Sequence, residues 1–309
     1  MEKVYRLCAV IVNYKSARHS LECISSLQRE LDKSMDTIVI VDNNSGSEEL
    51  SILKEGIVRA GLSELAKIKE AHENKGFSAG NNIGIQTVDA EYYLLTNSDT
   101  IIQKGTISEL LSAADKYPGA GLFGPRLVSE NGEVQISCFK KMSPLYELIS
   151  AAGVGPVSRF LKKYSVVFEE HCGEDTPAWI SFACVLIRKN VVETSGLMDE
   201  EYFMYYEDVD YCRRAKDAGF DIIYVPEAEV VHLVGQSSKL KKLETEKKRL
   251  PEYFYRARSR YYIKYYGYNG FIRANIFWYL GRFLSLFRRL INGKKRLVPS
   301  GQHLDIWKK

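Results

Sequence analysis

The chain has 309 residues, a net charge of +4, and a composition of 45% hydrophobic and 27% charged residues. This composition provides enough apolar side chains for a substantial core in one or two domains, and it excludes a disordered chain. Neither a secretory signal nor an apolar run of transmembrane length is visible. The cysteines are scattered without metal-ligand spacing, so they are predicted to be reduced cytosolic thiols: Cys8, Cys23, Cys138, Cys172, Cys184 and Cys212.

The first hundred residues alternate between apolar runs and helical patterns. Strand, helix, strand, helix, strand, helix and strand are predicted, in this order, for residues 7–12, 20–31, 37–41, 47–60, a short run near Ile68, the residues after Gly80, and residues 92–95. This alternation is typical of an α/β fold with a Rossmann-like, mainly parallel sheet that helices cover on both faces.

Polar residues follow three of these predicted strands. They are Asn13-Tyr14, Asp42-Asn43-Asn44-Ser45 and Asn97-Ser98-Asp99. Each set alone is typical of a turn, because Asn, Asp and Ser are common turn residues. Ligands of open α/β sheets bind at the carboxyl ends of the strands, so three such sets at one sheet edge predict a shared ligand crevice.

The segment HENKGFSAGNN, residues 72–82, brings glycines, amides and a lysine together just ahead of a predicted helix. Such a loop suits close backbone approach to an anionic or nucleotide ligand. The alternative is a helix-entry loop in which Asn81 or Asn82 is the cap. The glycine motifs of dinucleotide-binding folds and of P-loops are absent, which excludes those two classes.

The segment FMYYEDVDYC, residues 203–212, places acidic residues inside an aromatic and apolar run. A carboxylate among Phe and Tyr rings is desolvated, which raises its pKa toward the range of a general base. Asp208 is the first candidate for that base. The alternative is that Glu207, Asp208 and Asp210 open a helix and pair with the arginines that follow.

The C-terminal part of the chain differs from the rest in charge. Residues 251–309 hold thirteen Lys and Arg against two acids, which leaves 30 basic and 37 acidic residues in residues 1–250. Apolar residues recur at helical spacing between residues 272 and 291, with arginines on the other side. The pattern fits an amphipathic helix on an anionic membrane surface, a helix packed on the rest of the chain, or a homodimer contact. The acidic first 250 residues argue against nucleic acid.

The chain carries, in this order, the segments VIVNY, IVIVDNNS, ENKGFSAGNN, YYLLTNSDT, GPRLV, AWISFACVLIRK, FMYYEDVDYC and YVPEAEVVHLVGQSS. This ordered set resembles family 2 glycosyltransferases of the GT-A fold, and among them the bacterial rhamnosyltransferase type that builds surface polysaccharides. The resemblance covers about residues 5–240. It implies a catalytic domain over residues 1–240 and a basic, aromatic helical region over residues 241–309.

The resemblance implies a nucleoside-diphosphate sugar as donor, either dTDP-rhamnose or a UDP-hexose. Asp99, at the family's D-x-D motif, and the late His232 would hold Mg²⁺ or Mn²⁺, although Asn97 replaces the first acid of that motif. The nucleotide pocket would be formed by Asn13, Tyr14, Asp42, Asn44, Asn74, Lys75, Gly76, Gly80, Asn81, Asn97 and Ser98.

The implied reaction is an inverting transfer in which Asp208, or Glu207 in its place, deprotonates an acceptor hydroxyl. Trp179 would offer a stacking face to the acceptor sugar, and a buried core position is the alternative. The implied acceptor is a glycan linked to a polyprenyl diphosphate, so the enzyme is expected in the cytoplasm, peripheral on the inner face of the plasma membrane. The other hypothesis is a catalytically silent module that binds a sugar nucleotide or a membrane.

Overall fold

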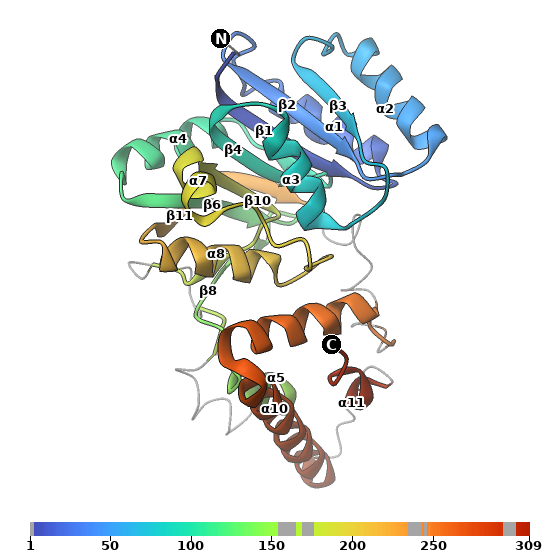
Figure 1. Cartoon of the computed structure of the whole chain (residues 1–309), viewed down its shortest axis with the longest axis vertical. Coiled ribbons are helices and arrows are strands. Elements are labelled where there is room, and N and C mark those ends of the chain that lie inside the picture. Colours follow the sequence, from blue (N-terminus) through green and yellow to red (C-terminus); the bar gives the residue numbers. More distant parts are fainter. Residues whose placement is uncertain are drawn as a thin grey trace.

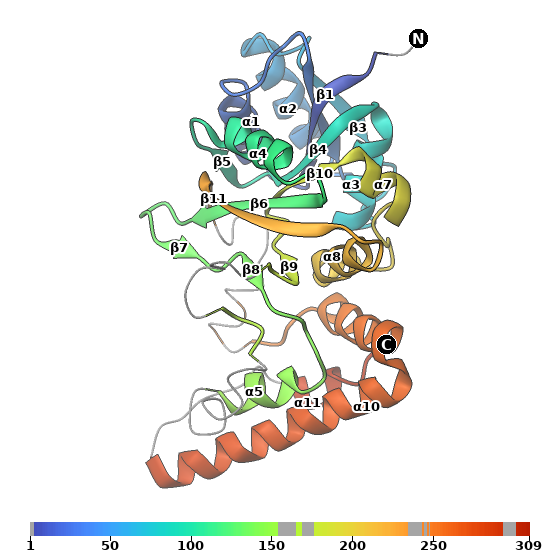
Figure 2. The same cartoon turned by 90° about the vertical axis from the view of Figure 1, so that its left-hand side faces the viewer.

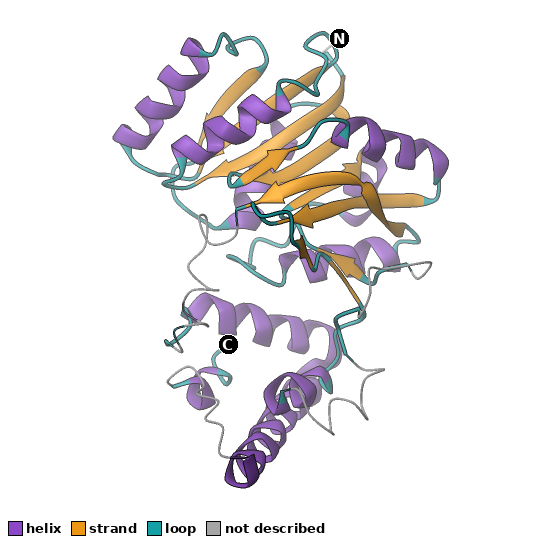
Figure 3. Cartoon of the chain, turned by 180° about the vertical axis from the view of Figure 1, so that it is seen from behind, coloured by secondary structure: helices purple, strands orange, loops and turns teal. Residues whose placement is uncertain are grey.

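The computed structural model describes residues 3–153, 165–168, 176–233, 243, 246, 248–292 and 301–309. A sheet with helices on both faces occupies the upper part of Figure 1, and a helical region that contains the C-terminus lies below it. Figure 3 shows the same arrangement from behind, coloured by secondary structure.

The strands lie mostly in the first 140 residues. They are β1 (Tyr5–Asn13), β2 (Asp36–Asp42), β3 (Ala66–Glu70), β4 (Ala90–Asn97), β5 (Thr100–Ile102), β6 (Ala120–Val128), β7 (Val134–Gln135), β8 (Cys138–Phe139), β9 (Trp179–Ile180), β10 (Cys184–Arg188) and β11 (Asp221–His232). The helices are α1 (Ala17–Leu27), α2 (Ser47–Arg59), α3 (Phe77–Thr87), α4 (Thr106–Lys116), α5 (Tyr146–Ala152), α7 (Lys189–Ser195), α8 (Glu207–Asp217), α10 (Glu252–Asn292) and α11 (Gln302–Asp305).

The main sheet has the strand order β3-β2-β1-β4-β10-β6-β11-β5, with β7 beside β6. The strands from β3 to β4 are parallel, as is the β6–β11 pair, whereas β10 runs antiparallel between β4 and β6. The predicted mainly parallel sheet with flanking helices is therefore confirmed. Its second half is mixed because β10 enters the sheet from the opposite direction.

Alternate residues of β1 face two separate cores, as expected for a strand buried on both faces. Leu7, Ala9 and Ile11 pack in a cluster with α1, α2 and α4. Cys8 and Val10 point to the other face and join a cluster with α3, α7 and α8. Double coverage fixes the register of β1, because a shift of one residue would exchange the two faces.

The helical region is organised around α10, which consists of two helices joined at a kink. At the kink, Gly267 has φ 65°, a left-handed conformation that glycine adopts without a Cβ clash. The first half lies below α8, and the long second half packs against α5, as Figure 2 shows. Because α5 belongs to the range 1–240, the division of the chain at residue 240 stays a prediction. Of the helices in the described part of the chain, none combines the length and apolar character that crossing a bilayer requires.

Three local predictions differ from the structure. The first helix begins at Ala17 and ends at Leu27, and α3 begins at Phe77 instead of after Gly80. Cys138 is disulfide-bonded, so the prediction of a reduced thiol is wrong there, because pairing depends on which distant residues the fold brings together. Cys172 lies outside the described residues, and the four free thiols, all buried, are Cys8, Cys23, Cys184 and Cys212.

Candidate active site

The carboxyl ends of three neighbouring strands meet at one edge of the sheet. Asn13 of β1 pairs in register with Asp42 of β2, and Val12 pairs with Asn97 of β4. The three polar strand ends predicted to share a crevice therefore lie side by side. Parallel pairing produces this result, since it aligns all carboxyl ends on the same edge.

Asn13 is fully buried and acts within the protein. Its Nδ2 donates to Asp42 Oδ1 at 2.8 Å, and its Oδ1 accepts a hydrogen bond from Ser20 at 2.8 Å. The backbone N–H of Ser45 donates to Asp42 Oδ2 at 3.1 Å. These bonds hold the Asp42 carboxylate in one orientation at the end of β2. Next to it, Tyr14 and Asn44 are exposed, and Asn44 has a left-handed φ of 61°.

The residue that joins the end of β2 to the loop before α3 is Asn43, which the sequence reasoning left out of the nucleotide pocket. Its Nδ2 donates to Asn74 Oδ1 at 2.9 Å and to the Gly76 carbonyl at 3.0 Å. The Gly76 N–H in turn donates to Asn74 Oδ1. The signal was present in the sequence, because Asn43 lies between two predicted pocket residues, Asp42 and Asn44.

The same loop contacts the segment that leads into α8. Gly76 has φ 93°, and a Cβ on it would lie 2.0 Å from the carbonyl oxygen of Phe203, so no other residue fits without movement. The Phe77 N–H donates to that carbonyl at 2.7 Å. Asn82 exchanges two hydrogen bonds of 2.9 Å with the backbone of Met198. The loop and the start of α8 are thus held together.

The other predicted loop residues have different environments. Lys75 is exposed and forms an ion pair with Glu73 at 3.0 Å. Gly80 faces Val12, where a Cβ would lie 2.8 Å from a methyl carbon, so this glycine allows α3 to pack closely on β1. Asn81 donates from Nδ2 to the Phe77 carbonyl, and its buried Oδ1 has no hydrogen-bond partner among the residues that the structure describes, which leaves an acceptor available to a ligand.

Asp208 and Glu207 form the first turn of α8, after a strained backbone turn. Tyr205 and Tyr206 both have left-handed φ values, of 72° and 67°, which non-glycine residues rarely adopt and which often mark functional sites. Burial raises the pKa of Asp208 to about 7, although its Oδ1 accepts a hydrogen bond from the Val209 N–H at 2.8 Å. Burial and then the Asp208 carboxylate raise the pKa of Glu207 well above its usual range.

The aromatic residues around this turn come from two segments distant in sequence. The rings of Phe203 and Tyr253 are 5.2 Å apart, and Tyr206 lies 6.0 Å from Phe254. The start of α10 therefore packs against the turn before α8, whose residues 203–206 stay half-buried. These rings add to the apolar surroundings of the turn, and apolar surroundings favour the neutral form of a carboxylic acid.

The third acid of α8 has a structural role, in agreement with the alternative drawn from the sequence. Asp210 is fully buried and forms ion pairs with Arg214 at 2.9 Å and Lys264 at 2.7 Å. It also accepts a hydrogen bond from Tyr265 at 2.8 Å. Asp210 therefore fastens α8 to α10 and leaves Asp208 as the acid with a pKa suited to proton transfer.

Asp99 and His232 lie together although 133 positions separate them in the sequence. The His232 Nε2 is 3.7 Å from Asp99 Oδ1, because β5 pairs with the end of β11, where Thr100 lies opposite His232. Carboxylate oxygen and imidazole nitrogen are both ligand types that suit Mn²⁺, so this pair has the donor atoms for a divalent cation. Within the described residues no group of three or more His, Cys, Asp or Glu side chains has metal-ligand geometry.

The other predicted residues of the D-x-D segment and the acceptor side have protein partners or intermediate exposure. Ser98 is buried, with its Oγ 3.0 Å from that of Ser16, and Asn97 is half-buried at the end of β4. Trp179 stacks on Phe139, with ring centroids 3.8 Å apart, and its Nε1 donates to the Lys140 carbonyl. One face of the Trp179 ring is thus covered by protein, and its role toward an acceptor stays a prediction.

The fold and this site define the class of protein. The mannosyltransferase PcManGT from Pyrobaculum calidifontis, solved with GDP-Man and Mn²⁺, has a TM-score of 0.60 to this chain at 12% identity, covering 95% of this chain and 77% of its own. S. aureus TarS 1–349 in complex with UDP has a TM-score of 0.55 at 16% identity, covering 94% and 75%. The chain has the GT-A fold of glycosyltransferases, as predicted.

The sequence comparisons identify the family. The model of "Glycosyltransferase like family 2" matches residues 6–250, and the chain belongs to this family. The N-acetylglucosaminyl-diphospho-decaprenol L-rhamnosyltransferase of Mycobacterium tuberculosis is 30% identical over 235 residues, 73% of this chain and 75% of its own. The dTDP-rhamnosyl transferase RfbF of Shigella flexneri is 25% identical over 242 residues, 74% of this chain and 70% of its own. The chain is a glycosyltransferase with rhamnosyltransferase relatives.

Proposed function

We propose that this enzyme transfers rhamnose, with inversion, from dTDP-rhamnose to a hydroxyl of a glycan linked to a polyprenyl diphosphate. The main support is Asp208, a half-buried acid with a pKa of about 7 at the start of α8, where the loop at Gly76 contacts Phe203. Two relatives are named rhamnosyltransferases, one of them for a diphospho-decaprenol acceptor and the other for dTDP-rhamnose as donor.

In the proposed reaction Asp208 accepts the proton of the acceptor hydroxyl. The acceptor oxygen forms a bond to the anomeric carbon from the face opposite the nucleotide, and the bond from that carbon to the diphosphate oxygen breaks, with its electron pair leaving on the diphosphate. Asp42, fixed by Asn13, and the loop at Asn74 bind the nucleotide. Asp99 and His232 would hold a divalent cation, which when bound neutralises the charge of the leaving diphosphate.

Nucleotide titration and a transfer assay test this function together. UDP, dTDP and GDP are titrated calorimetrically into the protein with and without Mn²⁺, and transfer is followed from radiolabelled dTDP-rhamnose to a lipid-linked acceptor. Preferential, Mn²⁺-dependent binding of dTDP together with rhamnose transfer is expected. A folded protein that binds no nucleotide would instead be the silent module, and preference for UDP would point to a UDP-hexose donor.

The pH dependence of transfer should report on Asp208. Its folded-state pKa of about 7 lies above the ordinary 3.8. Between pH 3.8 and pH 7 the Asp208 carboxyl group is therefore protonated in the folded protein and ionised in the unfolded chain. We expect kcat/KM to rise about tenfold per pH unit up to about pH 7 and then level, because only the carboxylate accepts a proton. The free energy of unfolding of the wild type should fall as the pH rises from about 4 to about 7, and this fall should be smaller in the Asp208→Asn variant. A flat rate profile from pH 5 to 8 would contradict the choice of Asp208.

We also propose that the second half of α10 docks the enzyme on an anionic membrane. One side of this helix packs on the protein: Trp278 is buried, and a Cβ on Gly281 would lie 2.4 Å from the Leu148 carbonyl of α5. The other side carries a row of exposed apolar residues, the α10 stripe, each at least 43% exposed: Ile272, Ile276, Leu280, Phe283 and Phe287. Residues three and four apart share a helix face, so these side chains form one continuous surface.

Replacing Phe283 by Asp should weaken membrane binding by about tenfold or more, since burial of one Phe side chain stabilises by roughly 1.5–3 kcal/mol and the new charge is repelled by anionic lipid. The measurement is co-sedimentation with phosphatidylglycerol vesicles. Val58→Asp is the matched control, because Val58 is a similarly exposed apolar residue on the distant helix α2. Equal vesicle binding by both variants would contradict the proposal, and a dimer that only Phe283→Asp dissolves would identify a second copy as the occupant of the stripe.

A further inference from the structure

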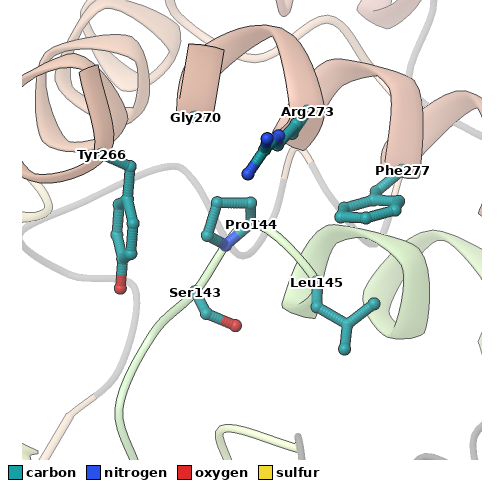
Figure 4. Close-up of a pocket in the computed structure, with 7 residues that line it drawn as sticks. All are labelled: Ser143, Pro144, Leu145, Tyr266, Gly270, Arg273 and Phe277. Atoms are coloured by element: carbon teal, nitrogen blue, oxygen red, sulfur yellow. The ribbon is translucent and has the colours of Figure 1, made fainter. Parts of the chain in front are cut away.

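A pocket of about 550 Å³ lies between α10 and the segment that leads into α5. Figure 4 shows its lining residues, with those of α10 above and those of the segment before α5 below. They are Ser143, Pro144, Leu145, Tyr266, Gly270, Arg273 and Phe277. The volume is within the range of about 300–1,000 Å³ typical of small-molecule sites.

Among the described residues that line the pocket, Arg273 is the only charged one, and it is exposed to solvent. In Figure 4 its guanidinium points from α10 across the pocket toward Pro144. It forms no ion pair or hydrogen bond with another residue of the described chain. By contrast, the neighbouring Arg258 is buried and satisfied in part by Glu147 at 2.8 Å. A guanidinium without an acidic partner, at the edge of an apolar pocket, is suited to bind phosphate.

Apart from Ser143, the remaining lining is apolar in character. Pro144, Leu145 and Phe277 present hydrocarbon, and the hydroxyl of Tyr266 already donates to the Met142 carbonyl at 2.6 Å, so its ring faces the pocket without a free donor. Gly270 is required by its own helix, because a Cβ there would lie 2.1 Å from Tyr266 Cβ beside the kink. A sugar, which needs several hydrogen-bond partners, is poorly matched to these walls.

The pocket adjoins both the α10 stripe and helix α8. Arg273 and Phe277 each lie three positions from a residue of the α10 stripe, Ile276 and Leu280 respectively, so the pocket row and the stripe are neighbours on one helix. On the other side, Arg213 of α8 lies 5.2 Å from the centroid of the Tyr266 ring. The pocket therefore lies between a lipid-facing surface and the helix that begins with Glu207 and Asp208.

We propose that this pocket binds the isoprenoid diphosphate end of the lipid-linked acceptor. Arg273 binds the diphosphate, and Phe277, Leu145 and Pro144 contact the first isoprene units, while the rest of the chain runs along the α10 stripe into the membrane. This inference rests on the proposed lipid-linked acceptor. It explains how a glycan hydroxyl is presented to Asp208 from a membrane-bound substrate, and it makes Arg273 a determinant of acceptor specificity.

The direct test is calorimetric titration of geranylgeranyl diphosphate, below its critical micelle concentration, into the full chain. Arg273→Gln should weaken binding about tenfold or more, because it removes a charged hydrogen-bond donor to phosphate. Phe277→Ser should weaken it as well. Arg256→Gln is the matched control, since Arg256 is an exposed arginine of the same helix that pairs with Glu252. Inorganic pyrophosphate and geranylgeraniol, titrated separately, should each bind more weakly than the intact diphosphate.

Each outcome either supports or overturns the inference. Failure of the wild-type protein to bind geranylgeranyl diphosphate overturns it, as does equal binding by Arg273→Gln and Arg256→Gln, or full competition by dioctanoyl phosphatidylglycerol, which would make the pocket a phospholipid site. In the transfer assay, Arg273→Gln should raise KM for a lipid-linked acceptor but not for its water-soluble analogue, with KM for the donor unchanged. If the protein binds geranylgeranyl diphosphate but transfers no sugar, the proposed function is rejected, while the assignment of an isoprenoid diphosphate to this pocket still holds.

Discussion

Replacing Asp208 by Asn is expected to lower kcat by about 10²- to 10⁴-fold, the usual contribution of a general base, and to leave nucleotide affinity within about twofold of wild type. The amide keeps the size of the carboxylate and the hydrogen bond from the Val209 N–H, so the start of α8 should keep its shape. It cannot accept the proton of the acceptor hydroxyl. The measurement is transfer under saturating donor and acceptor, with nucleotide affinity from calorimetry.

Two further variants separate a base from a merely structural acid. Asp217→Asn removes an exposed acid from the last turn of the same helix, and it should transfer at the wild-type rate. Glu207→Gln tests the second candidate. Glu207 is buried beside Asp208, and its pKa is raised well above its usual range, so its carboxylate form is disfavoured. If Glu207→Gln abolishes transfer while Asp208→Asn retains it, Glu207 is the base.

The first four strands of the sheet were predictable from sequence because β1, β2 and β4 contain short runs of β-branched and apolar residues with no competing pattern. All seven residues of β2 are buried, and the predicted run of residues 37–41 lies wholly within it. Helix ends were less predictable. No glycine or proline stops α1 at Leu27, and α3 begins at Phe77 because that residue bonds to Phe203, a tertiary contact that local sequence does not encode.

The candidate site was predictable to the extent that its residues sit at strand ends, where parallel topology brings them together. The separate role of each of these residues could not be predicted in this way. Asn13 and Asp42 are both buried polar residues at strand ends, yet Asn13 serves to orient the Asp42 carboxylate. Asp210 resembles Asp208, yet it pairs with Lys264, 54 positions away. Such roles depend on long-range partners, so the local pattern of a single segment cannot assign them.

Replacing Asp99 by Asn should lower Mn²⁺ affinity and transfer together. The carboxylate is buried, 1% exposed, beside His232, and it is the acid of the D-x-D segment that this chain retains. Loss of its charge should reduce transfer by about 10³-fold, because a divalent cation contributes several kcal/mol of charge stabilisation to the departing diphosphate. The measurement is Mn²⁺ binding by electron paramagnetic resonance in the presence of dTDP, followed by transfer assays over a range of Mn²⁺ concentrations.

A variant that adds a carboxylate to this site is expected to have the opposite effect on Mn²⁺ affinity. Asn97→Asp restores the first acid of the motif at the end of β4, and it should tighten Mn²⁺ binding, since a second carboxylate adds a hard oxygen ligand. Asp89→Asn is the control, because Asp89 precedes β4 at the opposite end of that strand and pairs with Lys189. Full Mn²⁺-dependent transfer by Asp99→Asn would contradict the proposed role of Asp99. Unchanged Mn²⁺ affinity in Asn97→Asp would mean that residue 97 points away from the cation. Asp99 and His232 would then be the protein's ligands to the cation.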